Sequence, residues 1–187
     1  MPEGLASSGY VLVTGNPGKI VEARRLCGFE LQTVEVDLPE IQSLDLVEVV
    51  RAKAAEAWRR VERPLVVEEV SLELAAFGGF PGPLIKWMLQ AMGPEGIASA
   101  VQRLGNNRAT ARALLLMTDG EHEIMAEGST SGELVLPPRG EGGFGWDPVF
   151  QPEGQTLTYG ELPSAEKDRL SHRGRAWRDL LSRLESS

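Results

Sequence analysis

The sequence predicts an α/β fold with a mixed sheet, and two observations support this prediction. Short apolar runs alternate with helix-like stretches, which is typical of βα units with parallel strands. Farther along, two long apolar runs meet at Asp119-Gly120, a turn signal that favours an antiparallel hairpin. The chain has 187 residues and contains no repeat or long linker, so we expect one domain over residues 1–187.

Five stretches rich in β-branched and other apolar residues predict strands. They are Tyr10–Thr14, Leu31–Val36, the beginning of Pro64–Leu74, Ala109–Gly120 and His122–Leu136. The first is short and nearly all apolar, and the third begins in the same way. Both are therefore expected to be buried.

Helices are predicted where alanine, leucine and charged residues predominate. They are Lys19–Cys27, Leu46–Val61, Leu84–Met92, Glu95–Leu104 and a last helix that begins near Ser164 and continues to Leu184. Gly93-Pro94 separates the third helix from the fourth, because proline cannot continue a helix.

The composition argues against several classes of function. The net charge of −8 argues against a surface that grips nucleic acid, which needs clustered lysine and arginine. Cys27 is the only cysteine, so an intrachain disulfide and a cysteine-based zinc site are impossible. The sequence has no apolar stretch of about 18 residues, and its first ten residues do not resemble a signal peptide. We therefore expect a cytoplasmic protein with neither a nucleic acid polymer nor a membrane as partner.

The stretch "VTGNPGKIVEA", Val13 to Ala23, suggests a phosphate site at a strand-to-helix turn. It is not the loop G-x-x-x-x-G-K-[ST], because Val13 and Ile20 stand where that loop needs glycine and a hydroxyl. Asn16 and Lys19 would nevertheless lie near the positive end of a helix, which favours anions. An ordinary turn with a solvated lysine is the alternative.

Two loops, Phe77–Pro83 and Pro137–Pro148, combine glycine, proline and aromatic residues. Such loops suit the close approach of main chain to a flat ligand. The alternative is a pair of tight turns in which Phe144 and Trp146 pack into the core.

Four polar clusters complete the pattern, and each alone has an ordinary surface explanation. They are Asn16 with Lys19, Glu40 in "DLPEIQS", Glu68 with Glu69, and Lys167, Ser171, His172 and Arg173 in "EKDRLSHRG". Together they indicate cations for a polyphosphate, carboxylates for Mg²⁺ and an aromatic loop for a base.

The combined motifs resemble the inosine/xanthosine triphosphate pyrophosphatase family, which removes non-standard purine nucleotides. The similarity rests on "TGNPGK", "DLPEIQS", "GGFPGPLIKW", "GGFGWDPVF" and "SHRGRA", which follow the family's order across nearly the whole chain. It implies an elongated mixed central sheet with flanking helices, and two lobes with an active-site cleft between them. It also implies an Mg²⁺-dependent homodimer that cuts a nucleoside triphosphate between the α and β phosphates, which gives a monophosphate and pyrophosphate.

The resemblance also assigns roles to individual residues. The expected phosphate contacts are Thr14, Asn16, Lys19 and, after a one-residue gap in the match, Lys53. Lys86 is expected to contact the substrate, because it matches a lysine that points into the cleft. The expected metal ligands are Glu40 and Glu69, and Glu69 is also the expected catalytic residue. The base-binding loop would be Phe144, Gly145, Trp146 and Asp147, and further contacts to base and phosphate would come from Lys167, Ser171, His172 and Arg173.

These residue types fit a choice between bases. Hypoxanthine and xanthine present a 6-keto acceptor, whereas adenine presents a 6-amino donor. A buried donor such as Arg173 can bond the keto group and is left unpaired against adenine. Stacking on Phe144 and Trp146 would add affinity without selecting a base.

One motif departs from the family's pattern. An acidic residue, then aspartate, then serine or threonine is usual where this chain has Glu68-Glu69-Val70. Glu69 is one methylene longer, and Mg²⁺ demands strict octahedral geometry. We expect an active enzyme, because the other contacts are present. The alternatives are a nucleotide-binding pseudo-enzyme with weak activity and a pyrophosphatase for another modified nucleotide.

Overall fold

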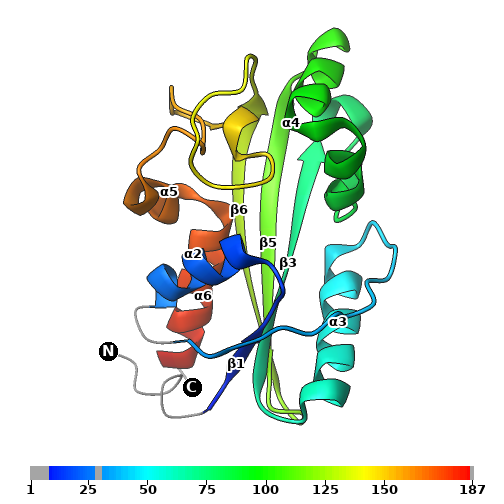
Figure 1. Ribbon diagram of the computed structural model, residues 1–187, viewed down its shortest axis with the longest axis vertical. Helices are drawn as coiled ribbons and strands as arrows, with labels where there is room; N and C mark the ends of the chain where they lie inside the picture. The colour runs from blue at the N-terminus through cyan, green and yellow to red at the C-terminus, as the bar shows by residue number, and fades with distance from the viewer. Residues whose placement is uncertain (1–8, 28–30, 186–187) are drawn as a thin grey trace.

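A seven-stranded mixed sheet forms the centre of the molecule (Figure 1). The computed structural model describes residues 9–27 and 31–185. The strand order is β2-β1-β3-β5-β6-β7, and β4 pairs with β3 off this path. The strands are β1 (Val11–Val13), β2 (Thr33–Val34), β3 (Leu65–Leu74), β4 (Pro81–Gly82), β5 (Arg108–Thr118), β6 (Glu123–Leu134) and β7 (Phe150–Pro152). β1 is parallel to β2 and β3 while the other pairs are antiparallel, which confirms the predicted mixed sheet.

Helices cover both faces of this sheet (Figure 1). They are α2 (Pro17–Cys27), α3 (Leu46–Val61), α4 (Ile85–Arg103), α5 (Ser164–Leu170) and α6 (His172–Glu185), with short 3₁₀ turns at Ala75–Phe77 and Asp147–Val149. Leu65 and Val67 pack with α3, whereas Val66 between them packs with α2 and α6. Because successive strand residues point to opposite faces, α3 lies on one face and α2 and α6 on the other.

A third core cluster marks a second lobe at the other end of the sheet. There Leu72 and Leu74 of β3 pack with Ile85 and Ile97 of α4 and with Phe150 of β7. The strands β3, β5 and β6, with 10, 11 and 12 residues, contribute to the cores at both ends. The two lobes therefore share one sheet, which confirms the expected elongated fold.

Most of the predicted elements are present. α3 has the predicted bounds, and its first turn is capped by Asp45, whose Oδ1 accepts a hydrogen bond of 2.8 Å from the main-chain N of Val47. Gly93 has non-helical angles (φ 66°, ψ 171°) and divides α4 where the sequence predicts a break. The hairpin is also confirmed, since Thr118 pairs with Glu123 across the predicted turn. The strand predicted over Leu31–Val36 shortens to β2.

The prediction of one continuous C-terminal helix is wrong. Ser171 is extended (φ −71°, ψ 155°) and separates α5 from α6. Its Oγ accepts a hydrogen bond of 3.0 Å from the main-chain N of Gly174, so it caps the start of α6. This break turns the chain and places His172 and Arg173 in the first turn of a separate helix.

No helix in the part of the chain that the structure describes is long and apolar enough to cross a membrane. Residues 1–8 lie outside that part.

Candidate active site

A cavity of about 840 Å³ lies between the two lobes, and its size is typical of a site for a small molecule. Its walls come from the loops after β1 and β2, from α3, β3 and the start of α4, from the 144–147 loop and from the start of α6. The residues predicted for the site that line it are Thr14, Asn16, Lys19, Glu40, Lys53, Glu69, Lys86, Phe144, Gly145, Trp146, Asp147, His172 and Arg173. Lys167 and Ser171 are the two predicted residues that do not line it.

The β1–α2 turn is held by its own side chains. Oδ1 of Asn16 accepts hydrogen bonds from the main-chain N of Gly18 (2.9 Å) and of Lys19 (3.3 Å), so Asn16 caps α2. Oγ1 of Thr14 accepts a bond of 3.2 Å from the main-chain N of Asn16. The turn therefore has a fixed shape, with the amide NH₂ of Asn16 and the hydroxyl hydrogen of Thr14 still able to donate.

Lys19 is a buried cation and not a solvated one. Its residue is 9% exposed, and its Nζ lies 3.2 Å from the main-chain oxygen of Glu68 and 3.4 Å from Oε1 of the same residue. Burial lowers the pKa of Lys19, and the carboxylates of Glu68 and Glu69 oppose this effect. The alternative of an exposed lysine on an ordinary turn is therefore wrong.

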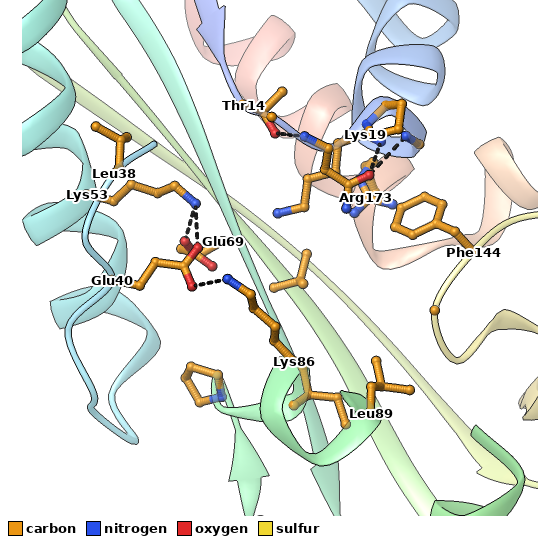
Figure 2. Close-up of a pocket in the computed structure, with 18 of the residues that line it drawn as sticks. Thr14, Lys19, Leu38, Glu40, Lys53, Glu69, Lys86, Leu89, Phe144 and Arg173 are labelled. Carbon is orange, nitrogen blue, oxygen red and sulfur yellow. Dashed lines mark hydrogen bonds and ion pairs between the residues drawn. The ribbon is translucent and has the colours of Figure 1, made fainter. Parts of the chain in front are cut away.

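Two carboxylates and two lysines meet on the other side of the cavity (Figure 2). The Nζ of Lys53 forms an ion pair with Oε1 of Glu69 and lies 3.6 Å from Oε1 of Glu40. The Nζ of Lys86, from the other lobe, donates a hydrogen bond of 3.0 Å to Oε2 of Glu40. Burial alone would raise the pKa of Glu40, but Lys86 and Lys53 outweigh it and lower that pKa. Burial would lower the pKa of Lys53, but Glu69 raises it. Both groups therefore carry their charges at neutral pH.

Arg173 is the centre of a second, fully buried charge network. Its Nε and Nη2 donate to the carboxylate of Glu68 at 2.8–3.0 Å, and its Nη1 donates to Oε2 of Glu22. Burial would raise the pKa of Glu68, but Arg173 and Lys19 hold it at about 2. Each Nη of Arg173 has a second N–H, so the guanidinium is fixed in place and can still donate to a ligand.

The 144–147 loop, which the sequence predicts to bind the base, rests against this network. The ring centroid of Phe144 lies 5.2 Å from Cζ of Arg173 and 5.4 Å from Nζ of Lys167. The main-chain N of Phe144 donates a bond of 2.6 Å to Oδ2 of Asp147, which fixes the loop. The ring packs so closely on Gly18 that a β-carbon there would lie 2.4 Å from its Cδ1. Phe144 is only half buried, so the alternative of core packing holds for Trp146 and not for Phe144.

His172 and Trp146 form the buried floor near this loop. The His172 residue is 2% exposed, and neither of its ring nitrogens has a hydrogen-bond partner among the described residues. Its ring centroid lies 6.1 Å from that of Trp146, with an angle of 30° between the planes. Burial, with Arg173 close by, lowers the pKa of His172 well below its ordinary value. The imidazole is therefore neutral, and one of its ring nitrogens is a donor while the other is an acceptor.

Lys167 and Ser171 act behind the cavity wall. The Nζ of Lys167 lies 2.6 Å from Oε1 of Glu22 and 2.6 Å from Oδ2 of Asp147. Lys167 thereby ties α5 to α2 and to the 144–147 loop, while Ser171 caps α6. Neither residue lines the cavity.

Glu22 is a buried carboxylate behind the cavity that the sequence reading missed. It is 5% exposed and joins Arg173 to Lys167, residues that lie more than 140 positions away in the chain. Glu22 stands three positions after Lys19 and one before the buried Ala23, so it lies on the inner face of α2. A carboxylate on that face was the available signal.

Comparison with known proteins shows which family the chain is similar to. A model of the Ham1 family matches residues 10–183. Inosine triphosphate pyrophosphatase 2 of Trypanosoma cruzi is 40% identical over 177 residues, covering 92% of this chain and 90% of that protein. The dITP/XTP pyrophosphatase of Thermococcus kodakarensis is 38% identical over 178 residues, covering 94% and 96%.

Solved structures share the fold. A HAM1 protein from Coxiella burnetii superimposes with a TM-score of 0.82 at 24% identity, covering 95% of this chain and 98% of that one. The nucleoside-triphosphatase, or dITP/XTP pyrophosphatase, of Mycobacterium abscessus gives a TM-score of 0.69 at 26% identity, covering 92% and 98%. The chain therefore belongs to the Ham1 family, which confirms the resemblance of its motifs to the inosine/xanthosine triphosphate pyrophosphatases.

Proposed function

We propose that the protein is a nucleoside triphosphate pyrophosphatase that hydrolyses ITP, dITP and XTP to the monophosphate and pyrophosphate, with Mg²⁺ as cofactor. Such an activity would remove non-standard purine nucleotides from the nucleotide pool. The observation that carries the proposal is a single cavity that brings together three kinds of chemical group. These are cations from both lobes, a pair of carboxylates, and an aromatic ring beside a fixed guanidinium.

The carboxylates fit a magnesium site of the kind completed by substrate. The described residues contain no group of three or more histidine, cysteine, aspartate or glutamate side chains placed to hold a metal. Mg²⁺ is commonly bound by one or two carboxylates together with phosphates and water, and Glu40 and Glu69 would supply that pair. The bound ion would offset the negative charge of the phosphates.

The cations of the cavity would hold the triphosphate. Lys19, at the capped start of α2, and Lys53 and Lys86, on the other side, line the same space. Fixed positive charges are most effective where negative charge builds up on the leaving pyrophosphate. The Glu69 carboxylate would take a proton from the water that attacks the α phosphorus, and the bond from that phosphorus to the bridging oxygen would break.

Base choice would depend on the far end of the cavity. Phe144 offers a half-exposed ring for stacking, and Arg173 beside it offers its remaining N–H groups. A 6-keto oxygen accepts from such a donor, whereas the 6-amino group of adenine leaves it unpaired. Since Glu22 and Glu68 hold the guanidinium, it cannot easily turn away from the wrong base.

A panel of purified substrates tests the proposal. With Mg²⁺, ITP should give IMP and pyrophosphate in equal amounts, and ATP should be cleaved far more slowly. IDP and orthophosphate as first products would refute the assignment. Tight binding of ITP without turnover would favour the pseudo-enzyme, and a better substrate outside the inosine and xanthosine nucleotides would favour the other alternative.

We also propose a homodimer that acts in the cytoplasm, as the family resemblance implies. Light scattering on the purified protein gives the mass of the assembly, and a mass equal to one 20.3 kDa chain would contradict the dimer. Fractionation of the source cells tests the compartment.

A further inference from the structure

Lys53 bridges the two carboxylates that the proposed function assigns to the metal (Figure 2). Its Nζ forms an ion pair with Glu69 and lies 3.6 Å from Oε1 of Glu40. Only 12% of the Lys53 side chain and 10% of the Glu69 side chain are exposed. Among the ion pairs of the described residues, Lys53 is the one cation that contacts both carboxylates, because Lys86 contacts Glu40 alone.

The ammonium group therefore stands where the positive charge of the metal would be needed. Two carboxylates in a partly desolvated cleft repel each other, and Lys53 offsets this repulsion. A divalent cation between the same oxygens would lie within a few ångström of the ammonium and would be repelled by it. Metal that arrives alone must therefore displace Lys53 from both partners.

We propose that Lys53 is an internal counter-ion that holds the metal position and makes metal binding depend on the nucleotide. The inference rests on the proposed function, since it assumes that a triphosphate enters this cavity. Phosphate oxygens give Lys53 new charged partners at the moment when the metal reaches Glu40 and Glu69. The metal and the nucleotide then strengthen each other's binding by the same factor.

The positions of the residues suit such an exchange. Glu69 lies within β3 and Lys53 lies within α3, whose first turn is capped by Asp45, so the main chain at both residues is held in place. The lysine side chain is a flexible four-carbon stem, which can carry its ammonium between neighbouring partners without any change of the main chain. Lys19, on the phosphate side, lines the same cavity as Lys53. The exchange therefore requires rotation of one side chain only.

Binding of Mn²⁺ alone, followed by electron paramagnetic resonance, tests the proposal. Lys53→Met keeps the length of the side chain and removes its charge, and it should bind one Mn²⁺ per chain at least about tenfold more tightly than the parent. Lys86→Met is the matched control, because that lysine is 55% exposed and contacts Glu40 only. Its affinity for Mn²⁺ should change by about threefold or less. Equal affinity of the parent and Lys53→Met would overturn the proposal.

Further variants make the result independent of folding and of the proposed activity. If Lys53→Met does not fold, Lys53→Gln takes its place. In either variant, Mn²⁺ should raise the unfolding temperature by more than it does in the parent. Adding Glu69→Gln should abolish the gain, because one of the two carboxylates is then neutral. An ITP analogue with a methylene bridge between the α and β phosphorus should increase Mn²⁺ affinity more in the parent than in Lys53→Met. If the parent releases pyrophosphate but binds Mn²⁺ as tightly as Lys53→Met does, only the counter-ion role of Lys53 is refuted. If Lys53→Met binds Mn²⁺ more tightly than the parent but the parent releases no pyrophosphate from ITP, only the proposed function is refuted.

Discussion

Adding a single methyl group at Gly18 should displace the ring that we expect to stack on the base. A β-carbon built on Gly18 would lie 2.4, 2.7 and 2.9 Å from Cδ1, Cε1 and Cγ of Phe144. Ordinary contacts begin near 3.4 Å, so in Gly18→Ala the ring must move by about an ångström. Alanine is also the better residue within α2, by roughly 0.5–1 kcal/mol, so the helix itself should not be weakened.

The expected cost falls on nucleotide binding. Stacking of a base on an aromatic side chain contributes roughly 1–3 kcal/mol, and losing it would weaken binding by about 5- to 150-fold. Since stacking does not distinguish bases, the KM for ITP and the KM for ATP should rise by similar factors. Steady-state kinetics on both nucleotides, together with calorimetric binding of the methylene-bridged ITP analogue, would measure this effect.

A double-mutant cycle supplies the control. Phe144→Ala removes the ring, so Gly18→Ala should cause no further loss in that background. If Gly18→Ala binds ITP as the parent does, Phe144 does not stack on the base from its present position. If Gly18→Ala still weakens binding in the Phe144→Ala background, the new methyl group acts on the phosphate turn and not through the ring.

Three further predictions concern the charged residues of the cavity. Glu69→Gln should nearly abolish pyrophosphate release while binding of the methylene-bridged analogue persists, because the amide keeps the shape and loses the basicity; turnover at the parent's rate would remove Glu69 from the chemistry. Arg173→Lys should lower the ratio of kcat/KM for ITP over ATP, since it keeps the charge and loses the forked donors; an unchanged ratio would exclude Arg173 from base choice. The pKa of Glu68 is about 2 in the folded protein and ordinarily 4.5, so the stability from its ionised form is complete above pH 4.5 and is lost as the pH falls toward 2. Urea titrations give the free energy of unfolding of the parent and of Glu68→Gln. The difference between the two proteins should be clearly larger at pH 7 than at pH 3. A difference that does not change with pH would contradict the assigned pKa.

Local signals were sufficient for most of the fold. The helix over Leu46–Val61 follows from its composition, and the β5–β6 hairpin follows from Asp119-Gly120. The C-terminal helix was predicted to be continuous because strong helix formers flank "SHRG" on both sides. Ser171 nevertheless ends one helix and caps the next, since its hydroxyl competes for the main-chain N of Gly174.

The candidate site was only partly predictable, because its charges are paired over long distances in the chain. All but two of the site residues that the motifs predicted line the cavity. They did not indicate that Arg173 would be held by Glu68 and Glu22, which lie 105 and 151 positions away. Lys167 was expected to contact the ligand because the family resemblance assigns it to the C-terminal contacts with base and phosphate. Its burial against Glu22 and Asp147 depends on how α5 packs against α2, which local sequence does not specify.

The strands shared by the two lobes restrict how the protein can adapt to a substrate. A hinge needs a few residues whose main-chain angles can change freely, and β3, β5 and β6 instead cross from lobe to lobe as continuous hydrogen-bonded ladders. Rotating one lobe against the other would require bending or breaking these ladders along their length. Adaptation to a ligand would therefore depend mainly on the loops at the rim of the cavity and on side-chain rotation. If a nucleotide binds as we propose, the shared strands would hold its α phosphate and its base at a fixed separation.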